Sequence, residues 1–72
     1  MAEQVVTDVS GNVWKVLVKV GDEVKAGDVL FILELMKTEV PHAAPSDGRV
    51  SAVLIDEGEA VEADQPAITI ET

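Results

Sequence analysis

The sequence contains no cysteine, a single histidine and only two aromatic residues, and these absences exclude several classes of protein. Without cysteine there can be no disulfide framework, zinc knuckle or thiol nucleophile. No apolar run approaches the roughly 18 residues that a membrane-spanning helix needs, and residues 1–6 lack the basic start and apolar stretch of a signal peptide. We therefore expect a soluble, cytoplasmic protein with no membrane partner.

Basic side chains are also scarce. Five Lys and Arg residues stand against fourteen Asp and Glu residues, which gives a formal net charge of −9. Because nucleic-acid affinity comes mainly from lysine and arginine on phosphates, this balance excludes a nucleic-acid partner. The acidic surplus is either a solvated face that keeps the protein in solution or a surface that attracts a basic partner. The 47% apolar fraction still predicts a packed core, and 72 residues allow one domain.

The residues that could support catalysis are few. The motifs G-x-S-x-G and H-E-x-x-H and a glycine-rich phosphate loop are all absent from the sequence. His42 is expected to be a surface or sheet histidine, and Trp14 a strand aromatic that covers apolar surface or, alternatively, anchors an interface. The spacing of Asp56, Glu57 and Glu59 does not fit an EF-hand loop and indicates a solvated turn. We expect a protein that is not an enzyme.

An internal repeat organises the chain. Residues 11–34 align without a gap on residues 48–71, each residue matching the one 37 positions later, and 8 of the 24 pairs are identical. The sequence therefore predicts two halves, residues 1–35 and 38–72, within one domain, with Met36 and Lys37 at the joint. If a pseudo-twofold axis relates the halves, the joint lies at the opposite end of the domain from the chain termini.

Alternating polarity within each half predicts β-strands. Over residues 14–20 the even positions are apolar and share one face, whereas Lys15 and Lys19 point the other way. Gly21 and Gly58 precede acidic residues at matching points of the repeat and predict equivalent turns with positive φ. Short strands separated by such turns indicate an all-β flattened barrel or sandwich.

The segment from residue 29 to residue 40 has a helical spacing of apolar residues, but two observations favour a hairpin. Residues 31–34 match the alternating strand pattern of residues 68–71, and Pro41 would obstruct a continuing helix. The hairpin then lacks the favoured turn residues Asn-Gly or Asp-Gly. We infer that its turn residues serve something other than stability.

At Glu34-Leu35-Met36-Lys37 the sequence resembles the biotin carboxyl carrier and lipoyl attachment domains, and in particular their small free-standing members. The resemblance runs from about residue 5 to residue 70. It implies a barrel-sandwich of two four-stranded antiparallel sheets related by a quasi-dyad. It also implies a modified lysine at a tight hairpin, which here is Lys37. Leu35 replaces the usual small residue of the biotin motif, and Thr38 replaces its second methionine.

The resemblance also implies the function of the chain. Lys37 would receive biotin from a biotin-protein ligase that reads Glu34, Met36 and Thr38. The swinging arm would then carry carboxylate between the biotin carboxylase and carboxyltransferase sites of a carboxylase or decarboxylase. A monomer is expected, with no bound metal. Two alternatives remain open, a lipoyl carrier with lipoate on Lys37 and a non-carrier barrel-sandwich interaction module.

Overall fold

The computed structural model describes residues 2–72, which form eight short β-strands joined by turns. Within these residues, no helix has the length and apolar character that crossing a membrane requires. In chain order the strands are β1 (Ala2–Val6), β2 (Gly11–Val16), β3 (Glu23–Val24), β4 (Val29–Leu35), β5 (Thr38–Ala43), β6 (Gly48–Val53), β7 (Ala60–Val61) and β8 (Pro66–Glu71).

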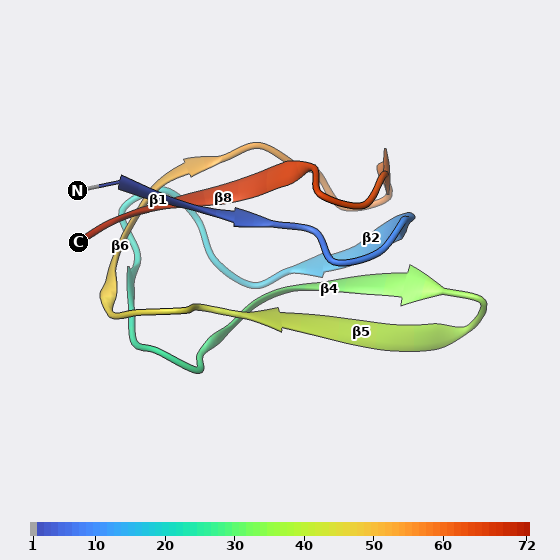
Figure 1. The fold of residues 1–72 in the computed structure, drawn as a ribbon, viewed down its shortest axis with the longest axis horizontal. Coiled ribbons are helices and arrows are strands. Elements are labelled where there is room, and N and C mark those ends of the chain that lie inside the picture. The colour runs from blue at the N-terminus through green and yellow to red at the C-terminus, as the bar shows by residue number, and fades with distance from the viewer. Residues whose placement is uncertain (1) are drawn as a thin grey trace.

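The strands build two antiparallel sheets that pack as two layers (Figure 1). One sheet has the order β1-β8-β6-β3 and the other has the order β5-β4-β2-β7. The predicted all-β flattened sandwich of two four-stranded antiparallel sheets is therefore confirmed.

The two sheets are copies of each other. Each strand of the first half has an equivalent four places later, so that β1 corresponds to β5, β2 to β6, β3 to β7 and β4 to β8. Exchanging equivalent strands converts one strand order into the other. The hydrogen bonds between the halves follow the same rule. The Gly21 amide donates to the Val50 carbonyl at 2.8 Å, and the equivalent Gly58 amide donates to the Val13 carbonyl at 2.7 Å. The pseudo-twofold symmetry expected from the repeat is present in the backbone.

The turns before and after the short strands β3 and β7 repeat as well. Gly21 and Gly58 have φ values of 98° and 87°, so the predicted positive φ is confirmed at both. Gly27 has φ 94°, and the equivalent Asp64 adopts φ 62°. Because a left-handed conformation is unfavourable for a residue with a Cβ, Asp64 keeps the turn geometry of the repeat at an energetic cost.

The core fills the space between the sheets with aliphatic side chains and one phenylalanine, and it too is nearly symmetric. Its equivalent pairs include Val13 with Val50 and Leu33 with Ile70, all almost fully buried. The complete set of buried apolar residues is Val5, Val13, Val24, Leu30, Phe31, Leu33, Ala44, Val50, Ile55, Val61, Ala67, Ile68 and Ile70.

Two buried polar residues break this symmetry. His42 stands where the other half has Val5, and its ring stacks on Phe31 with centroids 4.5 Å apart. The His42 Nε2 accepts the backbone N–H of Asp8 at 2.9 Å, and its Nδ1 lies 3.2 Å from the carbonyl oxygen of Val40. His42 was expected to lie either on the surface or in a sheet, and it is a buried residue of strand β5. The side chain ties β5 to the loop that follows β1.

The other buried polar residue is Thr7, at the position of Ala44 in the second half. Its hydroxyl donates to the carbonyl oxygen of Glu62 and accepts the backbone N–H of Gln65 at 3.0 Å. Both buried polar residues are therefore satisfied by partners far away in the sequence, as buried polar groups in folded proteins generally are.

The strand expected over residues 14–20 is wrong in its second half. β2 ends at Val16, and Val20 is 62% exposed in the connection to β3. A bulge between Val13 and Lys15 interrupts the pairing of β2 with β4, so that Trp14 is unpaired and 43% exposed rather than on the core face. The pairing of β6 with β8 shifts at the equivalent Ser51, which is also exposed.

The β4–β5 hairpin and the chain termini occupy opposite ends of the molecule, whose longest dimension is 33 Å (Figure 1). The hairpin extends beyond the other strands, and the N- and C-terminal segments lie next to each other at the far end. This arrangement agrees with the place expected for the joint between the repeats.

Candidate functional site

The β4–β5 hairpin closes through a two-residue turn. Leu35 and Thr38 form its last cross-strand pair, and Met36 and Lys37 are the two residues between them. Met36 has φ 51° and Lys37 has φ 66°. Positive φ at both central residues is the signature of a type I′ turn, which Asn-Gly and other glycine-containing pairs strongly favour. The Met36-Lys37 turn therefore has the backbone geometry that two-residue hairpins prefer, but neither of its residues favours that backbone conformation.

The side chains of this turn point away from the protein. Met36 is 90% exposed, and Lys37 is also exposed. Within residues 2–72, the Lys37 amine has no ion pair or hydrogen bond. A primary amine is thus presented at a tip whose backbone is fixed by six cross-strand pairs between β4 and β5. A group joined through an amide bond fits this arrangement, because an amide needs only an accessible amine and no enclosing pocket.

Three of the four residues expected in the recognition motif gather at the turn, and the fourth lies one step behind it. Met36, Lys37 and Thr38 are consecutive and exposed. Glu34 faces Glu39 across the hairpin and Asn12 on β2. Residues directly opposite each other share one face of a sheet, so the two carboxylates lie side by side, an arrangement that destabilises a hairpin.

The acidic residues after β6 have structural roles. A carboxylate oxygen of Glu57 accepts the backbone N–H of Val16 at 3.0 Å, and a carboxylate oxygen of Glu59 accepts that of Asp56 at 2.9 Å. The second contact repeats the bond from the Lys19 amide to Asp22 in the first half. Among residues 2–72, no group of three or more metal-ligating side chains comes together.

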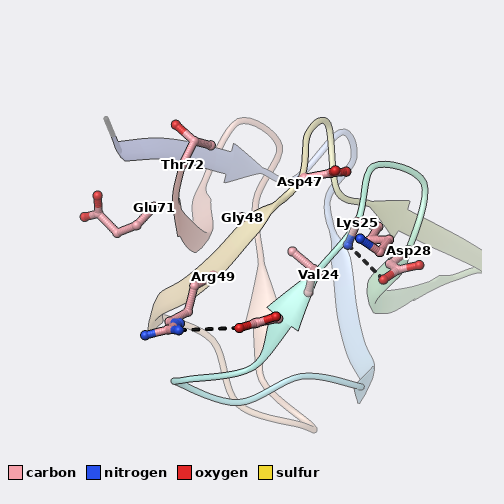
Figure 2. Close-up of a pocket in the computed structure, with 9 residues that line it drawn as sticks. Val24, Lys25, Asp28, Asp47, Gly48, Arg49, Glu71 and Thr72 are labelled. Carbon is pink, nitrogen blue, oxygen red and sulfur yellow. Dashed lines mark hydrogen bonds and ion pairs between the residues drawn. The ribbon is translucent and has the colours of Figure 1, made fainter.

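A pocket does exist, but it lies at the end of the molecule where Thr72 is found and not at the hairpin (Figure 2). Its walls carry both signs of charge. An ion pair joins Arg49 to Glu23 at 3.4 Å, and the Lys25 amide donates to Asp28 at 3.0 Å. Arg49 is the repeat equivalent of Asn12 at the base of the hairpin. This pocket therefore lies at the end of the molecule opposite the β4–β5 turn.

Comparison with known proteins identifies the family. Residues 2–70 match the family described as biotin-requiring enzyme. The chain is 41% identical over 63 residues to the biotinylated protein TB7.3 homolog of Mycobacterium leprae, covering 88% of this chain and 89% of that protein. It is 49% identical over 57 residues to the biotin carboxyl carrier protein of acetyl-CoA carboxylase of Haemophilus influenzae, covering 79% of this chain and 37% of that protein.

The fold has close counterparts among solved structures. The crystal structure of the urea carboxylase of Kluyveromyces lactis superposes with a TM-score of 0.92 at 38% identity, covering 99% of this chain and 6% of that protein. The chain likewise spans only 9% of the length of two mitochondrial carboxylase subunits that it matches.

These matches favour the biotin carrier over the lipoyl carrier and the non-carrier module. The predicted resemblance to this family is confirmed. A carrier domain of this kind holds its group covalently and is not itself a catalyst. The chain belongs to the family of biotin-requiring enzymes and is a biotin carboxyl carrier domain.

Proposed function

We propose that Lys37 is the residue that carries biotin and that residues 1–72, with their halves 1–35 and 38–72, form one biotinyl domain. The observation that carries this proposal is the Met36-Lys37 turn. Among residues 2–72, positive φ at a residue other than glycine occurs only at Met36, Lys37 and Asp64, and two of these three are adjacent at the most prominent tip. Such conformations cost of order 1–3 kcal/mol each and are typical of functional sites.

The chemistry of attachment requires a second protein. The Nζ of Lys37 attacks the carbonyl carbon of an acyl-adenylate, the C–N amide bond forms, the adenylate leaves as AMP, and the amine loses its proton. An ordinary lysine amine is almost entirely protonated at neutral pH, and protonated nitrogen is not a nucleophile. Because the exposed turn has no base positioned on this amine, we assign the deprotonation to a biotin-protein ligase.

The bound group supplies the capacity to take up carboxylate at one active site and release it at another. The domain contributes the tether, since a group held near both sites has a raised effective concentration there. The position of the hairpin suits this role, because its tip projects beyond the other strands and away from the rest of the domain (Figure 1).

We further propose that the domain works as a monomer and as a separate component beside a biotin carboxylase and a carboxyltransferase. The match to the Mycobacterium leprae protein supports a separate component, because it covers 89% of that protein.

Substitution of single lysines tests the attachment site. Lys37→Ala should abolish streptavidin binding after incubation with ligase, biotin and ATP, with an unchanged circular dichroism spectrum. Lys25→Ala, which removes an exposed lysine beside a different turn, is the matched control and should be modified like the unsubstituted chain. Streptavidin binding retained by Lys37→Ala would contradict the proposal.

A further inference from the structure

The internal symmetry supplies a reference for every surface position, because each residue of one sheet has an equivalent residue on the other. The outer face of the β5-β4-β2-β7 sheet departs from its equivalent on the other sheet. Ile32 pairs with Lys15 on one side and with Pro41 on the other, so these three side chains share one face. Leu33, which follows Ile32, is fully buried, so this face is the outer one.

The bulge in β2 adds Trp14 to this face. Trp14 and Lys15 together oppose Ile32, and the Lys15 ammonium lies 5.7 Å from the centroid of the Trp14 ring. Because two residues oppose one at the bulge, Trp14 and Lys15 both lie on the outer face, and the indole is 43% exposed. Trp14, Ile32 and Pro41, with Lys15 beside them, are called the Trp14 face below.

The other sheet shows that the scaffold does not require these residues. It has the same bulge between Val50 and Ala52, but the residue at the position of Trp14 is Ser51, whose hydroxyl donates to the carbonyl oxygen of Thr69 at 3.3 Å. Thr69 itself takes the position of Ile32, and Gln4 takes that of Pro41. One sheet therefore presents small and polar groups where the other presents tryptophan, isoleucine and proline.

The Trp14 face continues directly into the hairpin that bears Lys37. The next row of cross-strand pairs toward the tip is Asn12, Glu34 and Glu39, and beyond it lies the turn. Glu39 is a further departure from symmetry, because its equivalent is Ala2. The surface thus runs from an apolar centre with an aromatic residue, through two carboxylates, to the reactive amine. An aromatic centre with a charged rim is the usual composition of a protein-binding site.

We propose that the Trp14 face is the docking surface for the ligase that acylates Lys37, an inference that rests on the proposed function. The partner surface would offer an apolar recess to Trp14 and Ile32 and basic side chains to Glu34 and Glu39. Before modification the Lys37 amine is only a four-carbon stem away from the backbone. An enzyme that reaches this amine must therefore contact the surface beside the turn, whereas later partners meet a longer arm.

The test uses the symmetry of the chain. The variant Trp14→Ser, Ile32→Thr, Pro41→Gln places on the Trp14 face the residues that the other sheet has at the same positions. The matched control, Ser51→Ala, Thr69→Ala, Gln4→Ala, changes the other sheet. Initial biotinylation rates are measured at a series of domain concentrations with fixed ligase. We expect the KM for the domain to rise by about tenfold or more, with kcat within about twofold, because a docking anchor acts before the chemical step.

The outcomes separate docking from attachment. An unchanged KM, an equal rise in the control, or a fall in kcat alone would overturn the docking surface while leaving Lys37 as the attachment site. Failure of the unsubstituted chain to be biotinylated would instead overturn the proposed function. If the triple variant loses its cooperative thermal transition, Trp14→Ser alone provides the same comparison. A dimer of the unsubstituted chain that the triple variant dissociates would assign the face to self-association and overturn the proposal.

Discussion

Met36 and Lys37 are adjacent in the β4–β5 turn, and both hold a left-handed backbone conformation, with φ 51° and 66°. Replacing them by the preferred pair, Met36→Asn with Lys37→Gly, should raise the free energy of unfolding by about 1–2 kcal/mol, because this pair favours the type I′ turn. Urea denaturation followed by circular dichroism measures the change. The same variant should not be biotinylated. A less stable double variant would show that the native turn residues are held by interactions other than the turn geometry.

Gly21 and Gly58 provide a test of the repeat as a structural unit. Both have positive φ, and a Cβ added at either would meet no atom within 4 Å. Replacing either by valine should therefore act through backbone conformation alone and lower the free energy of unfolding by roughly 1–3 kcal/mol at each position. Thermal unfolding of the two variants measures this. Unchanged midpoints for both would contradict the conformational cost, and a lowered midpoint for only one would contradict the equivalence of the two turns.

His42 should contribute to the stability of β5 through its contacts with Asp8 and Phe31. His42→Val, which introduces the residue that the other half has at this position, should destabilise the fold by roughly 1–3 kcal/mol. The variant leaves the backbone N–H of Asp8 without its acceptor and removes the ring stacked on Phe31. Thr38→Ser, an exposed change on the same strand, is the control and should shift the thermal midpoint little. Equal midpoints for both variants would contradict this role of His42.

The residues beside Lys37 should set the rate of modification. Thr38→Met, which restores the second methionine of the biotin motif, should speed biotinylation. Met36→Asp with Thr38→Ala should slow it, since it removes an exposed thioether that suits an apolar slot on the ligase. The measurement is the initial biotinylation rate at fixed ligase concentration. Equal rates for all three proteins would show that the ligase does not read these two positions.

Much of this structure follows from the sequence because the repeat relates each strand to another. The match of residues 11–34 to residues 48–71 predicts the two halves, the equivalent glycine turns and the joint at Met36-Lys37, whereas the two four-stranded sheets are implied by the family resemblance. The helical spacing around Met36 is misleading, because cross-strand pairing overrides local propensity in a short hairpin.

Two features could not be predicted in the same way. A bulge adds one residue to a strand without a fixed sequence signature, so the alternation over residues 14–20 wrongly placed Trp14 on the same face as Val16. Comparing Trp14 with its repeat equivalent Ser51 is the signal that could have marked this surface. The buried His42 is hydrogen-bonded to the backbone N–H of Asp8, which is 34 residues away. The local sequence around His42 does not indicate so distant a partner, so its burial could not be predicted.

The intact mass of the purified domain tests the central claim most directly. The unsubstituted chain and Lys37→Arg are each produced once with a biotin-protein ligase and once with a lipoate ligase, and each is weighed by mass spectrometry. The account predicts that one biotinyl group is added to the unsubstituted chain, that none is added to Lys37→Arg, and that neither chain gains a lipoyl group. A biotinyl group on Lys37→Arg, or a lipoyl group in place of biotin on the unsubstituted chain, would contradict it.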